Sequence, residues 1–117
     1  MSVKHRGKSM LFLVLFSALW LQQGRAASFD CAQAHTEDEV AVCHTPVLND
    51  LDVQMATEYR LLRGLVAMGQ AGNMVDDQRK WLVARRRCGS QEACLLTRYR
   101  ERLRQLNDVY QGLDRPR

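Results

Sequence analysis

The chain has 117 residues and a formal net charge of +4. Four of its 17 Lys and Arg residues lie within residues 1–26, which hold no Asp or Glu, so residues 27–117 carry 13 basic and 13 acidic side chains. This balance lacks the basic excess of nucleic-acid-binding domains, and we expect no nucleic-acid partner. The small size limits the core that the domain can bury and favours covalent support.

Residues 1–26 have the three-part layout of a secretory signal peptide. A basic start at residues 4–8 precedes an apolar, charge-free run of 12 residues, 10–21. Gly24 and Ala26 then place small residues at the −3 and −1 positions of a cleavage site. We therefore expect cleavage near Ala26 and a periplasmic or secreted protein that begins near Ala27.

Two alternatives would keep the protein on a membrane. The apolar run is shorter than the roughly 20 residues that span a bilayer as a helix, which disfavours a retained anchor. Charged Asp30, rather than a small residue, precedes Cys31, which disfavours a lipid anchor. No stable membrane anchor is expected.

The first predicted helix follows Thr36 and ends at about Cys43. Thr36 and Glu39 have the spacing of a capping box, in which each side chain bonds the other residue's backbone N–H. Acidic residues in the first turn suit the positive end of the helix dipole. Thr45 and Pro46 then fit the N-cap and the first position of a second helix.

The second predicted helix has the strongest periodicity. Its apolar residues recur at spacings of three and four, and Asp52 and Glu58 fall off this stripe. The stripe consists of Leu48, Leu51, Met55, Tyr59, Leu62 and Val66. Such a pattern predicts an amphipathic helix. Gly69, Gly72 and Asn73 predict the loop that ends it.

The third predicted helix runs from about Met74 to Arg87, and the residues that share one face are Met74, Gln78, Trp81, Leu82 and Arg85. Residues 88–90 end it, and Ser90 fits the N-cap of a fourth helix. The fourth helix carries a further apolar stripe, made of Leu95, Leu96, Tyr99, Leu103, Leu106 and Tyr110.

No segment alternates with period two for long enough to predict a strand. The fold class is therefore all-α, a small antiparallel helical bundle or hairpin with a short leading helix. Residues 27–117 form a single domain, with a frayed tail at about 112–117.

All four cysteines lie after the signal peptide, and an even number in a small exported chain predicts two disulfides. The sequential pairing, Cys31–Cys43 and Cys88–Cys94, fits the helix boundaries, while a crossed pairing that ties the two halves together remains open. A zinc site is the alternative for Cys31, His35, Cys43 and His44. Two disulfides explain every cysteine at once, so we expect no metal and no cofactor.

The charges are unevenly distributed along the chain. Residues 27–59 hold seven acidic and no basic side chains, whereas residues 78–104 hold nine basic and two acidic ones. Either the two halves attract each other when the helices pack, or an acidic face meets a cationic partner. In the second case the partner-binding residues are Glu37, Asp38 and Asp50.

No catalytic residue is predicted, because nothing assembles a nucleophile, a base and an oxyanion site. His35 and His44 flank the first helix and are interpreted as loop residues. Trp81 is interpreted as core. Function by binding is thus favoured over function as an enzyme.

The pattern resembles a family of small exported bacterial proteins, the N-terminal-domain family of the LprI-type lysozyme inhibitor. In the first half the resemblance rests on Phe29-Asp30-Cys31, Thr36-Glu37, Glu39, Cys43, Pro46, Leu48, Leu51-Asp52, Met55 and Tyr59. In the second half it rests on Gln78, Trp81-Leu82, Arg85, Cys88, Cys94-Leu95, Tyr99, Arg102 and Leu106.

This resemblance implies an α-helical, disulfide-bonded protein of the periplasm or cell surface. For the member that gives the family its name, it implies binding and inhibition of lysozyme. Binding to a protein partner, with a lysozyme-type muramidase as the candidate, is therefore the first functional hypothesis. A structural or adaptor module of the cell envelope without lysozyme affinity is the second. The sequence leaves the oligomeric state undetermined.

Overall fold

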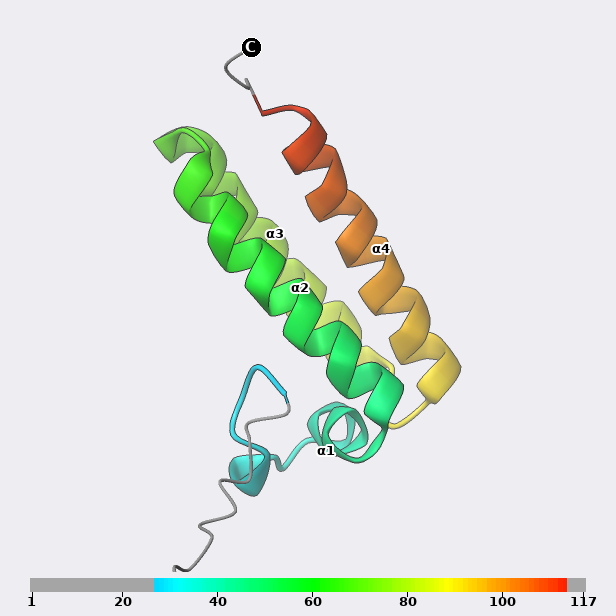
Figure 1. Ribbon diagram of the computed structural model, residues 1–117. Coiled ribbons are helices and arrows are strands. Elements are labelled where there is room, and N and C mark those ends of the chain that lie inside the picture. Colours follow the sequence, from blue (N-terminus) through cyan, green and yellow to red (C-terminus); the bar gives the residue numbers. More distant parts are fainter. Residues whose placement is uncertain (1–26, 114–117) are drawn as a thin grey trace, which may run out of the picture.

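The computed structural model describes residues 27–113 (Figure 1). The predicted signal peptide and residues 114–117 lie outside the described residues. Within residues 27–113 there is no strand, and the elements are a 3-10 turn and four α-helices: η1 (Cys31–Gln33), α1 (Glu37–His44), α2 (Pro46–Leu65), α3 (Met68–Arg87) and α4 (Glu92–Gln111). The prediction of an all-α bundle with a short leading helix is confirmed.

The three long helices run up, down and up, and α1 lies across the end at which α2 begins and α3 finishes (Figure 1). Helix α2 is therefore antiparallel to α3 and parallel to α4, against which it packs most extensively. Helix α1 contacts both α2 and α3. The end of the bundle that carries α1, called the α1 end below, brings residues from all four helices together.

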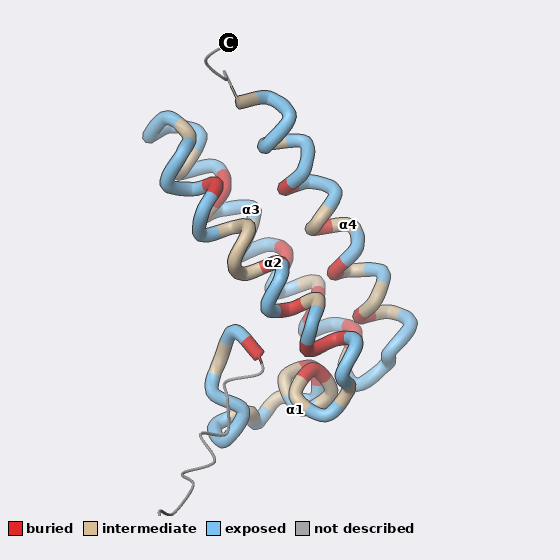
Figure 2. The backbone as a smooth tube through the Cα atoms, viewed as in Figure 1, coloured by how far each residue is buried: buried red, intermediate tan, exposed pale blue. Residues whose placement is uncertain are grey.

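The core lies on the faces that the helices turn toward one another (Figure 2). The predicted stripes supply most of it: Val42 of α1, Leu48, Met55 and Leu62 of α2, Met74 and Trp81 of α3, and Leu95, Tyr99 and Leu106 of α4. Burial of an aliphatic or aromatic side chain of this size stabilises a fold by about 1.5–3 kcal/mol. The residues that recur at helical spacing are therefore mostly the residues that pack in the core. The prediction that Trp81 is a core residue is confirmed.

The predicted loop at Gly69, Gly72 and Asn73 is wrong, because all three residues lie inside α3. The connection between α2 and α3 is only Val66 and Ala67. Glycine disfavours a helix by about 1 kcal/mol per residue, a local cost that packing elsewhere can offset. Buried Met74 provides such packing for α3, and the Ala71 N–H to Ala67 C=O hydrogen bond (2.9 Å) closes its first turn.

Capping differs from the predicted scheme in detail. Thr36 is the N-cap of α1, but its side chain makes no cap hydrogen bond. The Glu39 carboxylate accepts a bond from the backbone N–H of His35 at 3.2 Å, one residue before the expected donor. Helix α4 begins after Gln91 rather than Ser90. At the other end, α4 finishes at Gln111 as predicted, and Leu113 packs against the core.

Alanine at Gly69 or Gly72 is expected to raise the free energy of unfolding by about 0.5–1 kcal/mol at each site. A Cβ at either position meets nothing within 4 Å. Gly89 is the matched control, because its φ of +56° is left-handed and a Cβ there would lie 2.8 Å from Glu37 Oε2. Urea unfolding of the three variants checks this, and a loss of stability for the first two would show that glycine is required there.

Candidate functional site

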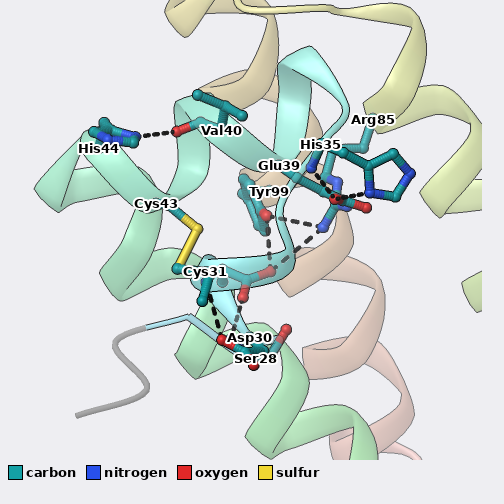
Figure 3. The surroundings of a disulfide bond; sticks show 12 residues. Ser28, Asp30, Cys31, His35, Glu39, Val40, Cys43, His44, Arg85 and Tyr99 are labelled. Carbon is teal, nitrogen blue, oxygen red and sulfur yellow. Dashed lines mark hydrogen bonds and ion pairs between the residues drawn. A yellow bond between two sulfur atoms is a disulfide. The ribbon is translucent and has the colours of Figure 1, made fainter. Parts of the chain in front are cut away.

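Two local disulfides brace the α1 end. Cys31 and Cys43 join η1 to α1 with Cα atoms 5.8 Å apart (Figure 3), and Cys88 and Cys94 join the end of α3 to α4 with Cα atoms 5.5 Å apart. The sequential pairing is confirmed, and no described cysteine is free. Such cross-links stabilise mainly by restricting the unfolded chain, by about 2–3 kcal/mol for loops of this order.

A buried ion pair links α1 to α3. Arg85 Nε donates to Asp38 Oδ2 at 2.8 Å, and both side chains are almost fully buried. The Arg85 guanidinium also lies 5.5 Å from the Phe29 ring centre and 5.7 Å from that of Trp81. Two aromatic faces therefore enclose the cation, so water contributes little to its solvation.

The same cation extends the network to α2 and α4. Arg85 Nη1 donates to the Tyr99 hydroxyl at 3.4 Å and lies 3.6 Å from Asp52 Oδ1 (Figure 3). The Tyr99 hydroxyl donates to Asp52 Oδ1 at 2.8 Å. The remaining oxygen, Asp52 Oδ2, accepts the backbone N–H of Ser28 at 2.6 Å. One hydrogen-bonded cluster, the Arg85 network, thus contacts all four helices and the segment before η1.

Burial and charge set the protonation states in this network. Burial acts to raise the pKa of Asp38, but the Thr36 hydroxyl and the Arg85 guanidinium outweigh it, and the pKa is lowered. Burial, together with the Asp52 carboxylate, raises the pKa of Tyr99. The Arg85 network therefore holds a carboxylate at Asp38, a cation at Arg85 and a neutral phenol at Tyr99 at neutral pH.

A smaller polar cluster lies farther along the bundle. Arg102 Nε donates to Gln78 Oε1 at 2.9 Å, and the Gln78 amide reaches Met55 Sδ at 3.3 Å. Burial lowers the pKa of Arg102. On α3, Trp81 lies between Gln78 of this cluster and Arg85 of the other. Its indole N–H donates to the Arg98 carbonyl at 2.8 Å. These contacts fix α3 against α4.

The structure separates the three predicted partner-binding residues. Asp50 and Glu37 are both exposed at the α1 end. Asp38 is only 2% exposed, so its expected place on an acidic surface is wrong. Its carboxylate is committed to Arg85, because a buried charge without a partner is very costly. Asp52, expected off the core stripe, is fully buried as well.

The acidic half and the basic half therefore attract each other, at least at Asp38, Asp52 and Arg85. The sequence offered that alternative but did not single out these residues. The missed signal was the position of Arg85 on the same helical face as Trp81, which places a charge where core is expected. A charge in such a place requires buried partners of opposite sign.

The two histidines lie at the surface, but the interpretation of both as loop residues is wrong for His44, which is the last residue of α1. His35 Nδ1 lies 3.1 Å from the Gln33 carbonyl, and His44 Nδ1 lies 2.9 Å from the Val40 carbonyl (Figure 3). Neither joins the Arg85 network. Within the part of the chain that the structure describes, no cluster of His, Cys, Asp or Glu has the arrangement of a metal site.

An apolar groove runs between α2 and α4 at the end of the bundle opposite α1. Leu61, Leu65, Leu106 and Tyr110 line it together with Glu58. Leu61 is 58% exposed and Leu65 is 66% exposed, which is high for leucine. None of the helices in residues 27–113 has the length and apolar character needed to cross a bilayer.

No family model matches the chain, and comparisons with curated proteins and with solved structures give no match either. Membership of the LprI-type family therefore stays a prediction that rests on the residues quoted above.

The lowered pKa of Asp38 predicts part of the acid sensitivity of this fold. Because the folded pKa lies below the usual 3.8, the ion pair contributes fully above that pH and is lost as the pH falls through the folded value. We expect the Asp38→Asn variant to lose less stability than the wild type as the pH falls below about 4. Urea unfolding at each pH measures this, and equal losses for the wild type and the variant would contradict it.

Proposed function

We propose that this chain is an exported binding protein of the cell envelope. It works by binding rather than by catalysis, and its first candidate partner is a lysozyme-type muramidase. Disulfides at the α1 end support export, because they persist in oxidising compartments outside the cytoplasm. The resemblance to the LprI-type family supports the choice of partner.

The observation that carries the proposal is the distribution of carboxylates at the α1 end. Asp38 and Asp52 are internal, whereas Asp30, Glu37 and Asp50 remain accessible beside a doubly braced scaffold. Lysozymes are usually basic and use two carboxylates in a cleft. An acidic surface steers such a cationic protein into contact, and rigid elements keep the contacting loop in place.

The test is titration of the folded, correctly bridged protein into a lysozyme-lysis assay at low and at physiological salt. We expect inhibition, and the double variant Glu37→Gln/Asp50→Asn should associate several-fold more slowly at low salt. The difference should shrink at physiological salt, where the Debye length is about 8 Å. Asp38 is excluded from the variant because its replacement would disturb the fold.

Asp76→Asn/Asp108→Asn is the matched control, since it removes two exposed carboxylates away from the α1 end. It should associate at the wild-type rate. Equal slowing of both double variants would show a net-charge effect rather than a specific surface. No inhibition at either salt concentration would remove the inhibitor hypothesis for the lysozyme tested.

The apolar groove favours a second candidate, a structural or adaptor module of the envelope. The exposed Leu61 and Leu65 side chains, which line one contiguous apolar groove, support this candidate. A pull-down from envelope extract would compare the wild type with Leu61→Ser/Leu65→Ser. A partner captured by the wild type and lost with this variant supports the adaptor, whereas a partner lost with Glu37→Gln/Asp50→Asn instead supports the acidic surface.

A further inference from the structure

The first described residues of the chain are core residues. Ala27 is 3% exposed and belongs to the hydrophobic core. The next residue, Ser28, donates its backbone N–H to Asp52 Oδ2 at 2.6 Å. The chain thus enters the bundle at a buried carboxylate, and Ala27 precedes that contact by one residue, about 3.8 Å of chain.

This first segment of the chain contacts the Arg85 network, in which the negative and positive charges are not equal in number. It contains two buried carboxylates, Asp38 and Asp52, but one cation, Arg85. The fourth member, Tyr99, donates a hydrogen bond to Asp52 through its hydroxyl and is neutral. One buried negative charge is therefore left without a cation, although buried charges are normally paired.

Arg85 of α3 and Tyr99 of α4 lie against Asp52, and Asp38 of α1 shares Arg85 with it. Among these groups only Arg85 is cationic. Arg60 of α2 lines a shallow surface pocket together with Ala27 and Ser28. It is exposed and makes no ion pair among the described residues, so it does not supply the missing charge.

We propose that Asp52 is the receptor for the chain's own α-amino group, which removal of the signal peptide creates at Ala27. The new ammonium group balances the Arg85 network and fixes the start of the chain against α2. In the unprocessed chain the same nitrogen is an uncharged amide, so the network is completed only after export. This inference rests on the predicted cleavage before Ala27.

An ammonium group held by a carboxylate is harder to deprotonate. The free α-amino pKa is about 7.7–8.0, and pairing with Asp52 raises the folded value above it. The exposed cation Arg60 acts in the opposite direction but is screened by solvent. A rise of one pKa unit leaves about tenfold less neutral amine at pH 7, and the neutral amine is the nucleophile.

The experiment is amine labelling of the exported protein at pH 7, followed by mass spectrometry. Residues 27–117 contain a single lysine, Lys80, which is exposed and serves as the internal reference. The comparison variant carries one extra alanine between Ala26 and Ala27, so that its ammonium group lies one residue farther from Asp52. Relative to Lys80, the α-amino group of the wild type should react at least about tenfold more slowly than that of the variant.

Intact mass first establishes that the wild type begins at Ala27, and any other start overturns the proposal at that step. With the correct start, equal labelling of the wild type and the alanine-insertion variant overturns it. The α-amino group of Asp52→Asn should label as fast as that of the insertion variant, if Asp52→Asn folds. The insertion variant keeps every residue of the Arg85 network, so its result does not depend on whether Asp52→Asn folds. Neither result depends on whether the protein binds lysozyme.

Discussion

Replacing Arg85 by methionine is expected to lower the free energy of unfolding by about 3–5 kcal/mol. The change leaves the Asp38 carboxylate, only 2% exposed, without its 2.8 Å partner, and removes the cation nearest to Asp52. Small domains are stable by about 5–15 kcal/mol, so much of the total would be lost. Urea unfolding followed by circular dichroism measures the effect.

Arg86→Met is the matched control, because it removes the next positive charge from an exposed position and should change stability by no more than about 0.5 kcal/mol. The double variant Arg85→Met/Asp38→Leu should recover part of the loss, since replacing both members of a buried pair by apolar groups restores packing. A single variant as stable as the wild type would show that the Arg85 network does not hold the helices together.

Replacing Trp81 by alanine is expected to lower the free energy of unfolding by about 3–5 kcal/mol. Trp81 is buried, packs edge-on against Tyr99 with ring centres 5.0 Å apart, and donates a 2.8 Å hydrogen bond to the Arg98 carbonyl. The alanine variant leaves a cavity between α3 and α4 and an acceptor without its donor. Thermal and urea unfolding both measure the loss.

Trp81→Phe separates the two contributions, because it keeps most of the ring and removes the indole N–H, at an expected cost of about 1 kcal/mol. Leu82→Ala is the neighbouring control, since Leu82 is 39% exposed and should cost clearly less than Trp81→Ala. If both alanine variants lowered stability equally, Trp81 would not be a core residue.

Periodicity predicted the helices because a buried helical face imposes a spacing of three and four on the sequence. The helix boundaries it implied also favoured the sequential pairing of the cysteines, while a crossed pairing stayed open until the structure showed both bridges to be local. The loop predicted at Gly69 and Gly72 rested instead on the local preference of glycine for turns, and it was wrong because α3 continues through both residues toward buried Met74. Intrinsic preference is the weaker influence whenever tertiary packing competes with it.

The candidate site was predicted less well, for a physical reason. Charge counts along a sequence do not distinguish a carboxylate that meets solvent from one that meets a buried cation. Glu37 and Asp38 are adjacent, yet helix geometry turns one toward the surface and the other toward Arg85, 47 residues away. Only the packing of α1 against α3 determines which of the two is buried, so of the three predicted partner-binding residues Glu37 and Asp50 are exposed and Asp38 is not.

We propose that the chain is an exported domain with two disulfides that begins at Ala27. The most direct test is to recover the protein from the compartment in which it accumulates and to measure its intact mass before and after reduction. We predict the mass of residues 27–117, with a gain of four hydrogens on reduction as Cys31–Cys43 and Cys88–Cys94 open. A full-length chain, or one whose mass does not change on reduction, would contradict export and remove the basis for a partner in the cell envelope.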